Sequence, residues 1–266
     1  MRVRLPFYVG ALAFLTLGFL YVPMAAVAVF SVNKSRYGLL WKGFTLQWYG
    51  QLLKNEFIIG AARNTLILAL VSTIISTVLG TLLAIGMSRF PWPRWTRKFL
   101  DLMVYLPVVT PDIIFAAGLV IAFAVLRQIW SLFNPGLPTM IVGHVTFQIA
   151  FVALVVNSRL ATIGATLEEA ARDLYATSPH LLRRVTLPLL APGIVAGAML
   201  AFILSLDDFV ISFFTAGPQS TTLPIFIYAS VRRGVTPEIH ALSTVVFVVT
   251  VALVVALGMI LIRRKD

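Results

Sequence analysis

The chain has 266 residues, of which 59% are hydrophobic and 12% are charged, and its mean hydropathy is +0.95. Soluble globular chains are about 45–50% apolar, so this composition excludes a water-soluble domain. The formal charge of +11 raises nucleic-acid binding as a hypothesis, but an excess of Lys and Arg is also typical of the cytoplasmic loops of membrane proteins. Because the chain has no cysteine, disulfides and thiolate metal sites are excluded.

Apolar stretches long enough to cross a hydrocarbon core of about 30 Å recur along the chain. We predict an all-α integral membrane protein with about six transmembrane helices, forming a single domain over residues 1–266. The predicted spans cover residues 7–32, 65–87, 99–126, 140–156, 189–214 and 241–262. The first is too long for the apolar region of a signal peptide, so we interpret it as an uncleaved span.

The distribution of basic residues predicts the orientation of these spans. With six alternating spans, 13 of the 21 Lys and Arg residues lie on the side of the N-terminus. The positive-inside rule therefore places both termini in the cytoplasm. The basic and aromatic stretch at residues 89–98 then falls in an inner loop, where contact with lipid headgroups is favoured over nucleic-acid binding.

Away from the span ends, three acids lie inside predicted spans, namely Asp112, Asp207 and Asp208, and no Lys or Arg lies within those spans. A carboxylate at this depth is protonated, is held by hydrogen bonds, or binds an arriving cation. Tyr105 precedes Asp112 by seven residues and would share its face on a straight helix, where its ring offers a cation–π contact. These residues predict a passage for a cationic organic solute. The alternative is a structural role, with each carboxylate bound to neighbouring Ser, Thr or backbone groups.

Helix geometry separates the two neighbouring acids of the fifth span. On a regular helix Asp208 shares a small and polar face with Ser205 and Ser212, whereas Asp207 falls on an apolar face. Adjacent residues point about 100° apart, so we predict that Asp208 faces the passage. Asp207 then packs against another subunit or makes a second, less direct contact. The candidate pathway residues are Asp112, Asp208, Asp207, Tyr105, Ser205 and Ser212.

The longest cytoplasmic connection, residues 157–188, contains two signals for the start of a helix. Thr166 and Glu169 have the pattern of a capping box, which predicts a short helix over residues 167–176. Ser178 followed by proline is typical of a second helix start, and a further proline marks the entry to the fifth span. Two short helices along the inner membrane face indicate a docking surface for a partner. A solvated amphipathic linker is the alternative.

This connection resembles the EAA loop of permease subunits from bacterial ABC importers, whose pattern is EAA, three residues, glycine, nine residues and I-x-L-P. Glu169-Ala-Ala is followed at the same spacing by Val185-Thr-Leu-Pro188. Tyr175 stands where the pattern has glycine, and Val185 where it has isoleucine. The resemblance covers residues 64–264 in the order and spacing of the spans. The ATPase-coupling residues it implies are Glu168, Glu169, Ala170, Ala171, Asp173, Leu174, Tyr175, Ala176 and Pro188.

The resemblance implies a type I ABC importer permease bundle in the bacterial inner membrane. The implied partners are a second permease, identical or paralogous, a dimer of ATPase subunits and an extracytoplasmic substrate-binding protein. The EAA helix would insert into a cleft of the ATPase and carry its closure to the pore. The sequence lacks the G-x-x-x-x-G-K-[ST] pattern of a phosphate-binding loop. We therefore expect no enzymatic activity, cofactor or metal on this chain, with ATP and Mg²⁺ on the partner ATPase.

The residues around the acids also resemble one branch of the family, the spermidine/putrescine importers with their PotC-type permease. The similar stretches are residues 106–112 and residues 168–174. A third consists of Leu204-Ser-Leu-Asp-Asp208 and, after six intervening residues, Thr215-Ala-Gly-Pro218. A polyamine carries several ammonium groups, which spaced carboxylates and aromatic rings suit. Import of a polyamine is thus the implied function. Ferric iron or another small solute, carried by related permeases, is the alternative.

The sequence disfavours two further classes of function, a secondary transporter and an intramembrane enzyme. A secondary, proton-coupled transporter would show inverted repeats, and the sequence has no convincing internal symmetry. An intramembrane enzyme would need a nucleophile or metal constellation, but the three histidines do not cluster and no G-x-S-x-G occurs. His144 and Gln148, four residues apart on the fourth span, are interpreted as packed, hydrogen-bonded groups in preference to a pore-facing ligand pair.

Overall fold

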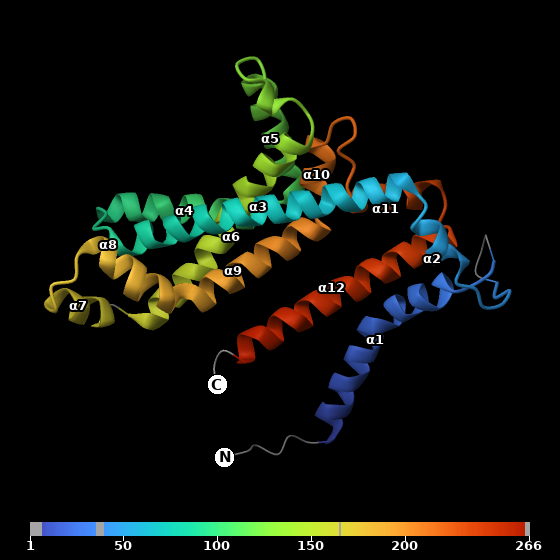
Figure 1. Cartoon of the computed structure of the whole chain (residues 1–266), viewed down its shortest axis with the longest axis horizontal. Coiled ribbons are helices and arrows are strands. Elements are labelled where there is room, and N and C mark those ends of the chain that lie inside the picture. The colour runs from blue at the N-terminus through green and yellow to red at the C-terminus, as the bar shows by residue number, and fades with distance from the viewer. Residues whose placement is uncertain (1–6, 36–39, 165, 264–266) are drawn as a thin grey trace. The chain divides into compact units, whose positions relative to one another are not determined.

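The computed structural model describes residues 7–35, 40–164 and 166–263, and most of them lie in helices (Figure 1). The α-helices are α1 (Phe7–Ser31), α2 (Gln47–Leu52), α3 (Glu56–Arg89), α4 (Arg94–Val109), α5 (Asp112–Leu126), α6 (Leu137–Ile163), α7 (Thr166–Asp173), α8 (Ser178–Leu181), α9 (Leu187–Asp207), α10 (Val210–Thr215), α11 (Leu223–Arg233) and α12 (Pro237–Arg263). A 3₁₀ turn, η1 (Ser131–Phe133), and a π-helical turn, η2 (Leu182–Thr186), complete them. The predicted all-α class is confirmed, because helices satisfy backbone polar groups that lipid cannot hydrate.

Four helical stretches of the described chain are long and apolar enough to cross a membrane. These are α1, α3, α6 and the continuous stretch Ser178–Asp207, and the bent pair of α4 and α5 makes a fifth if it is one span. The apolar stretch described in α12, Pro237–Ala252, is shorter. The total of about six spans and the cytoplasmic position of both termini stay predictions.

The third predicted span is broken, which corrects the expectation of one straight helix. α4 ends at Val109, α5 begins at Asp112, and the two helices bend by 109° at this break. Thr110 is extended, with a ψ of 130°, because the ring of Pro111 disfavours helical backbone at the residue before it. Tyr105 and Asp112 therefore do not share a helix face.

The fifth predicted span begins earlier and ends earlier than expected. Helix α8 runs through the π turn η2 into α9, so the second short helix of the connection is the start of a continuous 30-residue stretch, Ser178–Asp207. The π turn ends two residues before Pro188, which has no N–H to donate and whose ring would clash in a regular helix with the carbonyl of Arg184 four residues earlier. At the other end Asp208 is extended, with a ψ of 122°, and α10 begins at Val210.

By its internal contacts the chain divides into two compact units, residues 60–226 and the flanking residues up to 59 and from 227 on. In the 60–226 unit, α6 is central: it packs along α9, and α4 and α10 also pack against it. Its buried side chains include Val152, Val156 and Leu160, which pack with Leu190 of α9. The prediction of one permease domain over the whole chain stays a prediction.

Glycines allow the helices of the 60–226 unit to approach closely. A Cβ at Gly80 would lie 2.7 Å from the Cβ of Val152, and a Cβ at Gly193 would lie 2.7 Å from the Cβ of Arg159. At Gly197 the nearest contact is again Val152, at 3.2 Å. Glycine at these positions therefore lets α3 and α9 lie closely against α6.

In the flanking unit, α1 and α12 run side by side and α12 also packs against α2 (Figure 1). The buried side chain of Asn33 organises the loop after α1: its Oδ1 accepts the backbone N–H of Ser35 and of Lys42, and its Nδ2 donates to the carbonyl of Leu40. The indole N–H of Trp48 donates to the carbonyl of Asn33 at 2.8 Å. One buried side chain thus fixes the connection between α1 and α2.

Candidate functional site

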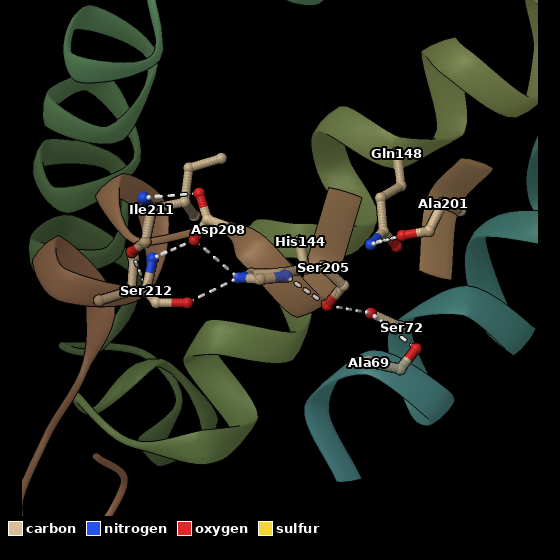
Figure 2. Close-up of polar contacts among 10 residues, drawn as sticks. Ala69, Ser72, His144, Gln148, Ala201, Ser205, Asp208, Ile211 and Ser212 are labelled. Carbon is tan, nitrogen blue, oxygen red and sulfur yellow. Dashed lines mark hydrogen bonds and ion pairs between the residues drawn. The ribbon is translucent and has the colours of Figure 1, made fainter. Parts of the chain in front are cut away.

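The break in the fifth span is held by the carboxylate of Asp208 (Figure 2). Its two oxygens accept the backbone N–H groups of Ile211 and Ser212, at 3.2 and 2.7 Å. These N–H groups belong to the first turn of α10, where a helix leaves donors unpaired. Asp208 therefore replaces the backbone hydrogen bonds that the fifth span loses where α9 ends.

His144 of α6 joins the two sides of this break. Its Nε2 lies 3.2 Å from Asp208 Oδ2 and 3.0 Å from Ser212 Oγ, and its Nδ1 lies 2.8 Å from Ser205 Oγ in α9. Ser205 Oγ is in turn 3.3 Å from Ser72 Oγ in α3 (Figure 2). The His144 side chain is fully buried and the Asp208 side chain is 10% exposed. A single imidazole thus bonds groups before, within and after the break.

These contacts supply the partner that the sequence did not identify for Asp208. The predicted spans of the three acids contain no Lys or Arg, and the group at hydrogen-bond distance from Asp208 is His144 of α6. The interpretation of His144 and Gln148 as packed groups is confirmed, since both are 0% exposed. Gln148 Nε2 donates to the carbonyl of Ala201 at 3.0 Å. The sequence carries one general signal for the contact between His144 and Asp208: buried polar side chains need hydrogen-bond partners, and polar side chains at similar depth in other spans can supply them.

Carboxylate, imidazole and serine hydroxyl in this order also occur in hydrolase triads. Here, however, Ser205 is only 2% exposed, and His144 contacts Ser212 with the same nitrogen that faces Asp208. A substrate carbonyl has no access to the hydroxyl. The geometry therefore supports a structural network and not a nucleophilic site.

The relative exposure of the two adjacent acids is the reverse of what a straight helix predicts. Asp207, the last residue of α9, is exposed, whereas Asp208 is mostly covered by its own chain. Asp112, at the start of α5, is exposed as well. The breaks of the third and fifth spans therefore each carry an exposed carboxylate. Which acid meets a substrate stays a prediction.

Tyr105 lies at another place in the 60–226 unit. About half of its surface is exposed, and it lines a small hollow together with Asp101 of its own helix and Asn157 of α6. The expectation that Tyr105 and Asp112 share a helix face is therefore wrong, because the chain bends by 109° between α4 and α5.

The helix α7 begins within one residue of its predicted start but ends at Asp173, before the predicted end at residue 176. The turn that ends it is a Schellman motif: the N–H of Ala176 donates to the carbonyl of Ala171, and the N–H of Tyr175 to that of Arg172. Tyr175 has a φ of +59°, in the left-handed region where glycine is favoured. A tyrosine thus adopts a left-handed conformation at the position where the EAA pattern has glycine.

One face of α7 and the turn after it is uncovered by the described chain. Glu169, Ala170, Asp173, Leu174 and Tyr175 are exposed, Leu174 and Tyr175 to 82% and 95%. Beside this face lies an open hollow of about 420 Å³. It is lined by Ala171, Leu174, Tyr175, Ala176, Thr177, His180 and Val185. An apolar tip beside a hollow suits a protein partner better than a solvated linker.

Glu168, placed by resemblance among the ATPase-coupling residues, differs from its neighbours because it is buried. Its Oε2 lies 2.9 Å from Nε of Arg89, the last residue of α3, and its Oε1 accepts the hydroxyl of Thr186 at 3.1 Å. Pro188 lies inside the continuous fifth-span helix and is exposed. No group of three His, Cys, Asp or Glu side chains among the described residues is arranged to hold a metal ion.

Solved structures of importers share this arrangement of helices. A bacterial ABC transporter that imports the acidic polysaccharide alginate matches with a TM-score of 0.77 at 20% identity, over 98% of this chain and 96% of its own. The MetNI methionine ABC transporter in an inward-facing conformation matches with a TM-score of 0.61 at 21% identity, over 83% and 97%. The type I importer fold implied by the EAA resemblance is confirmed.

Curated relatives are more similar in sequence. The putrescine transport system permease protein PotI of Escherichia coli (strain K12) is 39% identical over 230 residues, which cover 86% of this chain and 81% of PotI. The spermidine/putrescine transport system permease protein PotC of Haemophilus influenzae is 35% identical over 257 residues, 97% of each chain. Residues 76–265 match the family described as binding-protein-dependent transport system inner membrane component. The chain therefore belongs to this family of non-catalytic ABC transporter permeases.

Proposed function

We propose that this chain is a permease subunit of an ATP-driven importer that moves a polyamine, putrescine or spermidine, into the cytoplasm. The observation that carries the proposal is the 35–39% identity to putrescine and spermidine/putrescine permeases over most of the chain. Polyamines carry ammonium groups on a flexible chain, and the 60–226 unit exposes two carboxylates at its helix breaks.

In this proposal Asp112 and Asp207 meet the ammonium groups directly. Asp208, held by His144 and the backbone N–H of Ser212, adds negative charge beside Asp207. Tyr105 would contact the solute at a different point of the path. Carboxylates in a low-dielectric environment attract a cation more strongly than in water, which supports a substrate role for exposed acids at this depth.

The exposed face of α7 is proposed to dock on a dimer of ATPase subunits that carries ATP and Mg²⁺. Leu174 and Tyr175 form an apolar tip beside the hollow, and Glu169 adds a charge on the same face. An extracytoplasmic binding protein would deliver the solute, and a second permease, a paralogue of this chain, would complete the passage. The assembly would lie in the bacterial inner membrane, with this chain as a multi-pass subunit.

The test is uptake by the purified complex in liposomes, measured with labelled putrescine, spermidine, ferric iron and an anionic solute. We expect ATP-dependent accumulation of an amine and of neither ferric iron nor the anion. Asp207→Asn and Asp112→Asn should reduce amine uptake, whereas Glu56→Gln, which neutralises an exposed acid at the start of α3, should not. Accumulation of iron in place of amines would replace the substrate class, and uptake without ATP or ATPase would overturn the importer mechanism.

A further inference from the structure

The buried carboxylate of Glu168 lies within a segment whose neighbouring side chains face outward. Glu168 is 7% exposed, while Leu167 is 52% exposed and Glu169 is also exposed. A buried acid next to a docking face does not contact a docked partner, so its role lies within the chain. Buried charges are retained where they are paired and hydrogen-bonded.

Both oxygens of Glu168 are bound by other elements of the 60–226 unit. Arg89 at the end of α3 pairs with Oε2 at 2.9 Å, and Thr186 of the π turn donates to Oε1 at 3.1 Å. The same Arg89 donates through Nη2 to the carbonyl of Gly164, where α6 ends, at 3.0 Å. We call Arg89, Gly164, Glu168 and Thr186 the latch. It joins α7 to the ends of α3 and α6 and to the base of the fifth-span helix.

The position of the latch suits the transfer of movement. The Arg89 and Glu168 side chains are 28% and 10% exposed, so their pair is screened by water less than a surface salt bridge. Thr186 lies in the π turn, an irregular part of an otherwise continuous helix, and such turns recur at functional positions. A displacement of α7 would pull α3 through Arg89 and the fifth-span helix through Thr186.

We propose that Glu168 is a positioning residue of the coupling segment: it does not touch the ATPase but transmits the displacement of α7 to α3 and to the fifth-span helix through Arg89 and Thr186. This inference rests on the proposed function, in which an ATPase moves α7. It assigns Glu168 and Glu169 different roles, one inside the permease and one at its surface.

The first experiment measures ATP hydrolysed per amine imported by the reconstituted complex. Glu168→Gln and Arg89→Gln should each raise this ratio about tenfold, the scale of a coupling free energy, while the ATPase still co-purifies. The exchange Arg89→Glu with Glu168→Arg should restore at least part of the coupling, because it keeps an ion pair at the same place. The controls are Glu56→Gln, which neutralises an exposed acid, and Lys98→Gln, which neutralises an exposed base. Wild-type ratios in both single variants, or loss of the ATPase from them, would overturn the inference.

The second experiment uses the absence of cysteine in the chain, which allows clean labelling. Spin labels at Leu82→Cys in α3 and Arg172→Cys in α7 report the distance between the two helices with and without ATP. We expect a distance that stays constant through the cycle with the native latch and changes with ATP in Glu168→Gln. The same behaviour in both proteins would overturn the inference alone. A wild-type complex that neither binds an ATPase nor imports an amine would overturn the proposed function, and this inference with it.

Discussion

Two pairs of adjacent acids, Asp207 with Asp208 and Glu168 with Glu169, follow one arrangement. In each pair one carboxylate is bound by distant parts of the chain and the other is exposed. The counter-groups differ: Arg89 is a permanent cation near the surface of its helix end, whereas the buried imidazole at the fifth-span break is charged only when protonated. Each pair thus separates an acid that holds the fold from an acid that is available to a ligand or partner.

The backbone explains why only one of the two pairs is predictable from helix geometry. Glu168 and Glu169 lie in one regular helix, so their side chains point about 100° apart as a helical wheel requires. Between Asp207 and Asp208 the helix ends and the backbone becomes extended. A helical wheel therefore does not give the directions of these two side chains. A rule for helix faces is reliable only within an unbroken helix.

The largest effect should come from removing the partner of the covered acid in the span. His144→Leu leaves the Asp208 carboxylate without its side-chain donor, and the free energy of unfolding should fall by about 3 kcal/mol. Thermal unfolding of the permease in detergent measures this, with His180→Leu, which changes an exposed histidine, as the control. The double variant with Asp208→Asn should recover part of the loss, since no buried charge remains and the amide oxygen still accepts a backbone N–H. A single variant as stable as the wild type would contradict the pairing.

Neutralising the exposed acid of the same pair should act on transport and not on folding. Asp207→Asn should lower amine uptake about tenfold, the equivalent of one lost contact of ~1.4 kcal/mol, with the unfolding temperature unchanged. Uptake at a fixed amine concentration and thermal unfolding are measured on the same preparation. If Asp208→Asn instead lost uptake while keeping its stability, and Asp207→Asn transported normally, the roles assigned to the two acids would be exchanged.

A smaller effect is expected at the turn that follows the Glu168-Glu169 pair. Tyr175→Gly removes the cost of a left-handed backbone, about 1 kcal/mol, and should stabilise the turn. Hydrogen exchange at the amides of positions 175 and 176, the two donors of the Schellman motif, should be about fivefold slower in the isolated variant permease than in the wild type. Tyr175→Ala keeps a Cβ at the same φ and serves as the control. Equal slowing in both variants would contradict strain as the cause.

Much of the candidate site could be predicted from local sequence patterns. The start of α7 followed from the capping-box pattern, the coupling segment from its fixed spacing, and the three acids from their rarity in apolar spans. The two helix breaks were missed, although Thr110-Pro111 carries a local signal for the first of them.

The sequence by itself determined that the chain is a helical membrane protein, where most helices run and which segment has the EAA pattern, because apolar length, caps and spacing act locally. Only the tertiary structure decided that His144 meets Asp208 and that Arg89 meets Glu168, because these pairs join residues 64 and 79 positions apart. It also decided that Asp207 is the more exposed acid of its pair. A carboxylate turns toward whichever donor the packing of distant helices brings within hydrogen-bond distance, and no local pattern encodes that approach.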